Sequence, residues 1–176
     1  MEKDYTKLKI EDIVELANRG DTEAECELGY RFDNGLDVEQ DYREALKWYL
    51  KASGKGNADA FLAAAEIYYW GHGFKRDREK SQWFFLKACS CFDRDYKAGL
   101  KPGHSAFRIY EILYGGYTGD KYVAQADEWL KKAMDAKYPE AFCELARRHF
   151  LGENIAESNK KAASLYEQVV QLLVPE

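Results

Sequence analysis

The stretch "AECELGYRFDNGLDVEQDYREALKWYLKA", residues Ala24–Ala52, is soon followed by a second stretch, "AFLAAAEIYYWGHGFKRDREKSQWFFLKA", residues Ala60–Ala88. The two align without a gap, and aligned residues are always 36 positions apart. The matched residues of the first stretch are Ala24, Leu28, Phe32, Gly35, Asp41, Ala45, Trp48, Tyr49 and Ala52. Their counterparts in the second stretch are Ala60, Ala64, Tyr68, Gly71, Asp77, Ser81, Phe84, Phe85 and Ala88. A fixed period of this length indicates a repeat protein.

The spacing inside one copy predicts two helices joined by a turn. Ala24, Leu28 and Phe32 are four residues apart, as on one face of a helix. Gly35 follows where this helix must end, and glycine is the residue that turns there at least cost. A second helical stripe runs from Ala45 to Ala52. We call these two helices A and B. Their alanines allow close approach, and because one hairpin cannot bury its own apolar face, the copies must stack.

Two further copies match less closely. The third opens with Ser105, Ile109, Leu113 and Gly116, and closes with Ala126, Trp129, Leu130 and Ala133. The fourth has Ala141, Leu145, Gly152, Ile155, Ala162, Leu165 and Tyr166. Nine extra residues lie within "CSCFDRDYKAGLKPGHS", which holds the turn-forming residues Gly99, Pro102 and Gly103. The turn "GGYTGDKYV" of the third copy is irregular, so we expect irregular packing there.

The pattern "A-x3-LG-x2-[YF]-x2-G-x2-V-x2-D-x3-A-x2-WY-x2-A" of the first copy is similar to the Sel-one-like repeat, an α/α solenoid unit related to the tetratricopeptide repeat. The resemblance covers most of the chain, and the third copy departs from it with Tyr110 in place of a glycine. It implies an all-α fold, a right-handed α/α superhelix of about four helix-turn-helix repeats with an N-terminal capping helix. It also implies an adaptor whose concave groove, lined by the A helices, binds a peptide or protein partner.

The period predicts one repeat domain over the whole chain. Its parts are a capping helix at 1–23, repeat 1 at 24–59, repeat 2 at 60–104 with an insertion at 89–104, repeat 3 at 105–140 and repeat 4 at 141–176. The cap has the character of a lone helix B, and we expect its Ala17 to tolerate change better than the alanines of the repeats. At the other end, four apolar residues have no following repeat to cover them: Val169, Val170, Leu172 and Leu173.

Composition and charge narrow the classes of partner. The formal net charge of −5 over 176 residues argues against nucleic acid or anionic lipid. No apolar run approaches the roughly 18 residues that a membrane span requires. The N-terminal segment is amphipathic and acidic, unlike a signal peptide, so the four cysteines are expected to be reduced thiols in a cytoplasmic protein.

Catalytic and metal-binding motifs are missing from the sequence. It contains no G-x-S-x-G, H-E-x-x-H, P-loop or G-x-G-x-x-G pattern. Cys89-x-Cys91 beside two aspartates is a single thiol pair without a second pair at zinc spacing, which is a weak signal. Some cysteine-rich relatives in the resembled family are linked to β-lactam binding or hydrolysis, but the cysteines here do not recur with the repeat. We therefore predict no catalytic residue, metal or cofactor, and no enzymatic activity.

The exposed faces of the A helices form the predicted partner-binding groove. They combine eight acidic residues and two bases with five aromatic residues, which predicts a basic and apolar peptide as the ligand. The predicted binding residues are Glu27, Tyr30, Glu66, Tyr69, Trp70, Phe107, Arg108, Glu111, Tyr114, Glu144, Arg147 and Phe150.

Three alternatives stay open at this stage. The aromatic residues of the groove could instead pad neighbouring repeats. The apolar C-terminal helix could pair with a second copy, which would make the protein a symmetric dimer with a structural or assembly role. A small-molecule or hydrolase site in the groove is a third alternative, and it would require converging titratable groups with shifted pKa values.

Overall fold

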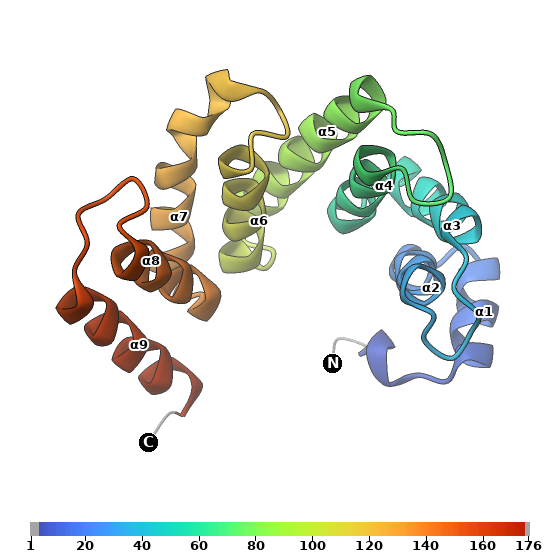
Figure 1. Cartoon of the computed structure of the whole chain (residues 1–176). Coiled ribbons are helices and arrows are strands. Elements are labelled where there is room, and N and C mark those ends of the chain that lie inside the picture. The colour runs from blue at the N-terminus through green and yellow to red at the C-terminus, as the bar shows by residue number, and fades with distance from the viewer. Residues whose placement is uncertain (1–3, 175–176) are drawn as a thin grey trace. The chain divides into compact units, whose positions relative to one another are not determined.

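A computed structural model describes residues 4–174 of the chain (Figure 1), and all regular structure in this range is helical. The short 3-10 helices are η1 (Tyr5–Lys7) and η2 (Asp120–Gln125). The α-helices are α1 (Ile10–Asn18), α2 (Thr22–Asn34), α3 (Tyr42–Gly54), α4 (Ala58–Trp70), α5 (Arg78–Lys97), α6 (Pro102–Tyr114), α7 (Ala126–Asp135), α8 (Pro139–Leu151) and α9 (Asn159–Leu173). The all-α helical repeat fold predicted from the sequence is confirmed.

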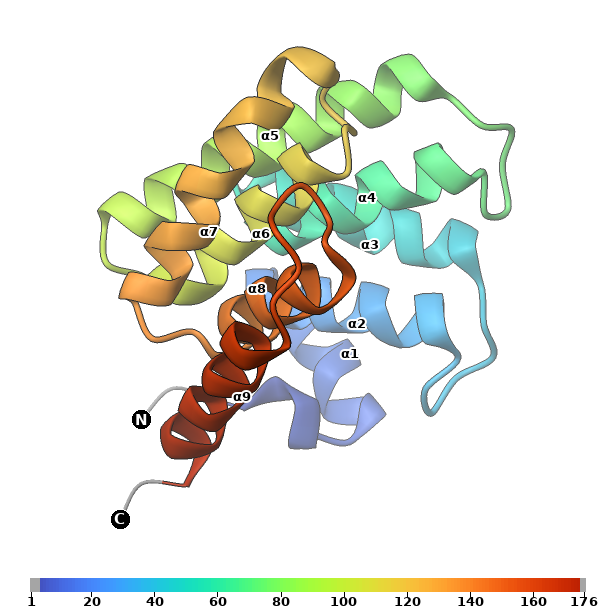
Figure 2. The same ribbon diagram turned by 60° about the vertical axis from the view of Figure 1, so that its left-hand side comes forward.

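The chain forms two compact units, residues 1–91 and 92–176, and α5 contributes residues to both. In the N-terminal unit, α1 packs on α2, α2 on α3 and α3 on α4. In the C-terminal unit, α6 packs on α7, α7 on α8 and α8 on α9. Figure 2 shows the antiparallel hairpins α2–α3 and α8–α9 within their units.

Left-handed glycines end the A helices of three repeats. Gly35, Gly71 and Gly152 have φ angles of 67°, 76° and 68°. Each glycine N–H donates to a carbonyl four residues back, and the next N–H donates to the same carbonyl. This is the C-terminal cap that the sequence predicts for Gly35. In the third repeat Gly115 stays helical and the left-handed residue is Gly116, so the chain enters η2 by a different turn.

Small residues bring the helices of a hairpin together. Ala24, Ala45 and Ala52 are fully buried in the first repeat. Gly29 lies under the ring of Tyr49, where an added Cβ would be 2.7 Å from Cδ1 of that ring. The aromatic side chain of helix B therefore fills the space that helix A leaves open, and larger residues in helix A cannot be accommodated without a shift.

The extra residues of the second repeat lengthen a helix. The α5 helix has 20 residues, whereas α3 has 13, so the insertion adds about two turns to helix B. Gly99 then turns the chain with a φ of 73°. Pro102 and Gly103, which the sequence suggests as turn residues, instead form the first turn of α6. Gly103 is buried there because Tyr138 lies against it, with its Cβ 2.8 Å from where a Cβ of Gly103 would be.

Two expectations for the ends of the array need correction. Ala17 of the capping helix is 2% exposed, because it packs with Ile13 against Ala24 and Leu28 of α2. It is therefore as constrained as the alanines of the repeats. Val169 is also buried, at 8% exposure, because it points into the α8–α9 hairpin. The other C-terminal apolar residues are half-buried or exposed.

Ala52→Leu should destabilise the protein by about 1–3 kcal/mol, because three added methylene-sized groups have no room beside a fully buried alanine. The matched control is Ala163→Leu, since Ala163 is an exposed alanine of α9 and the same substitution there meets solvent. Urea denaturation of both variants at low protein concentration measures the difference. Equal unfolding free energies would contradict the packing described for Ala52.

Candidate functional site

The predicted binding residues of the N-terminal unit lie on α2 and α4. We call the exposed side of these helices the α2–α4 face. Tyr30 and Trp70 are each 49% exposed, and Glu66 is exposed as well. Tyr69 is half-buried, with its ring centroid 4.8 Å from that of Trp70 and 6.2 Å from that of Phe85. The face therefore presents two accessible aromatic side chains next to a carboxylate.

Glu27 differs from the other predicted residues of this face. Its side chain is only 13% exposed, and its Oε1 accepts a hydrogen bond of 2.9 Å from Nε of Arg31. Arg31 also donates to Asp37 Oδ2 and to the carbonyl oxygen of Leu8, each at 2.8 Å. Glu27 is thus part of a buried ion pair that ties α2 to the N-terminal segment.

The helix A positions of the α2–α4 face are rich in acidic residues. The helix A positions that point to this side carry Glu23, Glu27, Asp33, Asp59 and Glu66 and no Lys or Arg. Asn57 Nδ2 donates to Glu23 Oε1 at 3.1 Å and joins the two helices. Burial raises the pKa of the Cys26 thiol, and the nearby charges of Asp59, Glu23 and Glu27 raise it further. At these helix A positions acidic residues therefore outnumber basic ones, although Glu27 is paired with Arg31.

Tyr49, a buried residue of α3, contacts the α2–α4 face through its hydroxyl group. The hydroxyl of Tyr49 donates to Asp33 Oδ2 at 3.2 Å. Burial raises the pKa of Asp33, and although the hydrogen bond from Tyr49 lowers it, the pKa stays above the ordinary aspartate value. Burial and the nearby Asp33 also raise the pKa of Tyr49. From the sequence we predicted only that Tyr49 is a core residue of helix B. The apolar spacing of that helix does not show which residue its hydroxyl group contacts.

The predicted residues of the C-terminal unit carry mostly paired charges. We call the corresponding side of α6 and α8 the α6–α8 face. Arg108 pairs with Glu111 at 2.7 Å, and its Nε is 3.3 Å from His104 Nε2. Arg147 pairs with Glu144 and with Glu153, each at 2.8 Å. The charges of this face are therefore largely satisfied within it.

Glu144 is held by partners from two helices. The hydroxyl of Tyr110 on α6 donates to Glu144 Oε1 at 2.6 Å, and Arg147 donates to both oxygens of the carboxylate. Burial opposes ionisation of Glu144, but the hydrogen bonds from Arg147 and Tyr110 outweigh it and lower its pKa. Burial raises the pKa of Tyr110, and the bond to Glu144 raises it further. Glu144 is therefore a structural carboxylate between α6 and α8.

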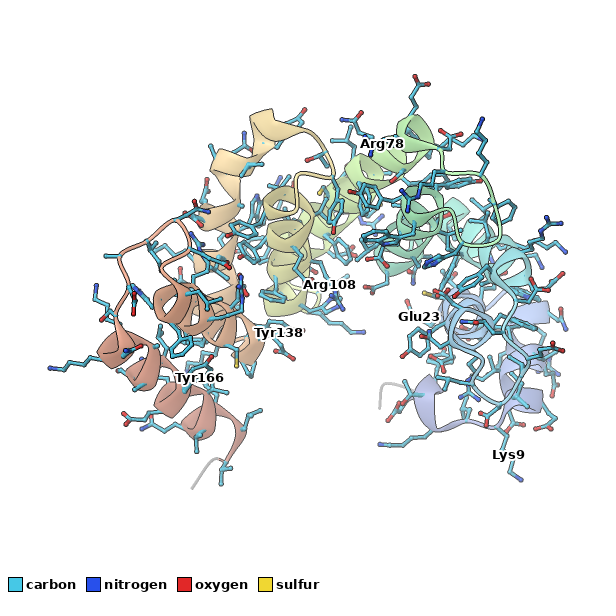
Figure 3. All side chains as sticks on the ribbon, in the orientation of Figure 1. Lys9, Glu23, Arg78, Arg108, Tyr138 and Tyr166 are labelled. Carbon is cyan, nitrogen blue, oxygen red and sulfur yellow. The ribbon has the colours of Figure 1, made fainter. Side chains whose placement is uncertain are left out.

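Most aromatic residues of the α6–α8 face pack against one another. The ring centroid of Phe107 lies 5.7 Å from Tyr110 and 5.5 Å from Tyr138. Tyr110 and Tyr114 stack at 5.3 Å. Arg108 and Tyr138 lie on the same side of the unit in Figure 3. Only Phe150, at 58% exposure, is largely accessible among the predicted aromatic residues of this face.

The described residues do not form a cluster suited to a metal ion. Within 4–174, no group of three or more His, Cys, Asp or Glu side chains is placed to hold a metal ion. None of the four cysteines is in a disulfide, and burial raises the pKa of Cys89 to about 12, so this thiol is protonated at neutral pH. No helix in the described range combines the length and apolar character needed to cross a bilayer.

The hairpins, glycine caps and stacked A and B helices define an α/α helical repeat protein. The Sel1 repeat family model matches residues 22–57, 58–91 and 139–168, which together make up more than half of the chain. The protein belongs to the Sel1 repeat family, whose members are generally protein–protein interaction modules. Residues 92–138, which hold the end of the insertion and the irregular third copy, are not matched.

A solved structure of a Sel1 repeat protein has the same fold. A Sel1 repeat protein from Oxalobacter formigenes is 21% identical, with a TM-score of 0.61 over 90% of this chain and 61% of that one. A protective antigen present in uropathogenic Escherichia coli strains, described as displaying an SLR fold, is 23% identical, with a TM-score of 0.46 over 92% of this chain and 40% of that one. The chain thus spans less than two thirds of either structure. No curated protein sequence matches it significantly.

Proposed function

We propose that this protein is a non-enzymatic interaction module that binds a protein segment through the exposed faces of its A helices. The observation that carries the proposal is the α2–α4 face, where the half-exposed rings of Tyr30 and Trp70 lie on helices whose positions on this side carry five acidic residues and no Lys or Arg. Acidic residues attract Lys and Arg side chains, and exposed aromatic rings bind the aliphatic stems of those side chains or neighbouring apolar residues. Four cysteines without a disulfide among them fit a reducing compartment such as the cytoplasm.

The two faces would contribute differently to binding. The carboxylates Glu111 and Glu144 of the α6–α8 face already pair with Arg108 and Arg147, so this face has little net attraction for a basic segment. Its exposed Phe150 offers an apolar anchor instead. We therefore propose that the basic residues of a partner bind to the α2–α4 face.

The twelve predicted binding residues fall into two groups under this proposal. One group is exposed or half-buried and would touch the partner: Tyr30, Glu66, Tyr69, Trp70, Arg108, Glu111, Tyr114, Arg147 and Phe150. The other group is held by neighbouring side chains: Glu27, Phe107 and Glu144. These residues would determine the shape and the electrostatic potential of the faces more than they would contact a ligand.

The test uses an array of synthetic peptides in which Lys or Arg alternates with Leu or Phe, with Glu replacing the bases in control peptides. We expect binding of the basic peptides only. For the best peptide, Trp70→Ala should weaken binding by about tenfold, because it removes an aromatic anchor. Glu66→Lys should act mainly on the association rate, and added salt should reduce that rate in the wild type.

Trp83→Ala is the matched control for the aromatic anchor. Trp83 of α5 is 51% exposed, but it packs against Phe61 and Lys87 and is not part of the α2–α4 face. Its replacement should leave peptide affinity unchanged. Equal capture of basic and acidic peptides, or equal losses for Trp70→Ala and Trp83→Ala, would refute the proposed site.

A further inference from the structure

The charges of the N-terminal unit are separated by helix type. Its A helices, α2 and α4, carry the acidic positions described above. The helix B segments have the opposite charge, because residues 42–54 and 71–91 contain eight Lys or Arg residues and three Asp or Glu residues. The net charge of −5 for the whole chain does not show this local excess of bases. The unit therefore also has a region suited to an anionic partner.

A continuous cluster of aromatic rings lies in this basic region. The ring centroid of Tyr68 on α4 is 6.4 Å from that of Phe74 in the following turn and 5.5 Å from that of Phe84 on α5. The ring of Trp83 lies 4.9 Å from Phe84 and 6.4 Å from Phe61. Phe74 is 37% exposed and Trp83 is 51% exposed. The cluster therefore reaches the surface at two rings.

Basic side chains lie over both exposed rings. The guanidinium carbon of Arg43 is 5.6 Å from the ring centroid of Phe74, and Nζ of Lys87 is 5.4 Å from that of Trp83. Arg43 also donates from Nε to the carbonyl oxygen of Gly73 at 3.4 Å. Among residues 4–174, neither Arg43 nor Lys87 forms an ion pair with a carboxylate. A cation over a ring keeps its charge and most of its hydrogen-bond donors, so both groups can still bind an anion.

A third cation lies over the ring in the middle of the cluster. Nζ of Lys80 is 5.3 Å from the ring centroid of Tyr68. Lys80 also forms an ion pair of 3.6 Å with Asp77, but 60% of its side chain is exposed, so water screens this pair. We call the three cations and their rings the cation–aromatic patch: Arg43, Tyr68, Phe74, Lys80, Trp83 and Lys87.

We propose that the cation–aromatic patch is a second interaction surface, which binds an acidic segment of a partner protein. Carboxylates of the segment pair with the cations, and an apolar side chain between them contacts Trp83 or Phe74. A single-stranded nucleic acid fits this surface less well, because its bases stack on open ring faces and here the cations lie over the rings. The patch and the α2–α4 face have opposite charges, so they bind different segments.

The patch by itself should bind weakly. Its cations are exposed, and exposed ion pairs each contribute little to affinity. A short acidic peptide should therefore bind with a dissociation constant of about 0.1–1 mM. Binding this weak is lost in the washing of a peptide array, where only basic peptides are expected to be retained, but a titration followed by NMR detects it.

The test is a ¹H–¹⁵N NMR titration of the 176-residue chain with a peptide in which Asp and Glu flank Phe and Leu. The indole N–H of each tryptophan gives its own signal, and the variants Trp70→Phe and Trp83→Phe assign the two that matter. We expect the Trp83 signal to move in a saturable way and the Trp70 signal to stay in place. A peptide with Lys in place of the acids should leave the Trp83 signal unmoved.

Lys87→Glu should weaken binding of the acidic peptide at least about fivefold, because it reverses a charge beside Trp83. Lys87 is exposed, so the variant should keep the wild-type helical content and melting temperature. The matched control is Lys160→Glu, which makes the same change of net charge at an exposed lysine of α9 in the other unit. It should leave the dissociation constant unchanged.

Three results would overturn the inference. They are a Trp83 signal that does not move at millimolar acidic peptide, a Trp83 signal that moves equally with the basic peptide, and equal dissociation constants for Lys87→Glu and Lys160→Glu. A tighter response of Trp83 to an oligothymidylate than to the acidic peptide would assign the patch to nucleic acid instead. None of these results depends on Trp70, so this inference and the proposed function can fail independently.

Discussion

Gly71→Val is expected to destabilise the protein by about 3 kcal/mol, because valine is strained in the left-handed region and its Cβ meets backbone atoms. Gly71 has a φ of 76°. A Cβ there would be 3.0 Å from both the backbone N of Arg76 and the carbonyl oxygen of Phe74. These atoms belong to the turn that leads to α5, so the clash cannot be relieved by rotating a side chain alone. Chemical denaturation monitored by circular dichroism measures the loss.

Two other glycines serve as comparisons. Gly35→Val should cost less than Gly71→Val, because the nearest atom to its Cβ would be Cβ of Gln40 at 3.3 Å. Gly54 is helical, and an added Cβ there meets nothing within 4 Å. Gly54→Ala should therefore stabilise α3 by about 0.5–1 kcal/mol, the usual gain in helix propensity. If Gly71→Val and Gly54→Ala changed stability alike, the left-handed cap would have no energetic role.

Arg31→Ala is expected to cost about 3 kcal/mol and to release the N-terminal segment from α2. Removing one partner of a buried ion pair leaves the other charge without compensation. The carboxylate of Glu27 and the carbonyl oxygen of Leu8 would both lose the guanidinium that binds them. Hydrogen exchange should show the release as loss of protection around η1, while denaturation reports the global effect.

Arg19→Ala is the matched control, because Arg19 and Glu15 form an ion pair with the same four-residue spacing but with both side chains exposed. Its loss should have little effect on stability. A second pair of substitutions should restore the stability lost in Arg31→Ala. The second and third repeats have the buried residues Ile67 and Ile112 at the position of Arg31, so an apolar side chain fits there. Arg31→Ile combined with Glu27→Gln should recover much of the lost stability. Equal losses for Arg31→Ala and Arg19→Ala would contradict the burial argument.

The helices and their ends could be predicted from the sequence because they depend on neighbours in the chain. Spacings of three and four residues identify the faces of α2 and α3, and Gly35 ends α2 through contacts within a few residues. The capping helix could be located by the same logic. The length of α5 could not, because glycine and proline residues at 99–103 left open whether the extra residues form a loop or a longer helix.

The composition of the candidate site could be predicted only in part. The sequence identifies which residues lie on the exposed side of each A helix, so Tyr30, Glu66 and Trp70 were expected to be accessible, and they are. It could not show that Glu27 pairs with Arg31 or that Phe107 packs against Tyr138. Tyr138 and Tyr49 were missed as neighbours of the site because they lie outside the A helices.

The sequence by itself determined the repeat, its helical period, its glycine caps and the family, because all of these depend on the spacing of residues that are close together in the chain. Tertiary structure decided which charges are free and which apolar residues are covered. Tyr110 meets Glu144 across 34 residues of chain, and Val169 turns inward while Val170 stays exposed. Such outcomes depend on where two helices cross and which rotamer fits between them. Helix periodicity limits these choices to one face but does not select the partner.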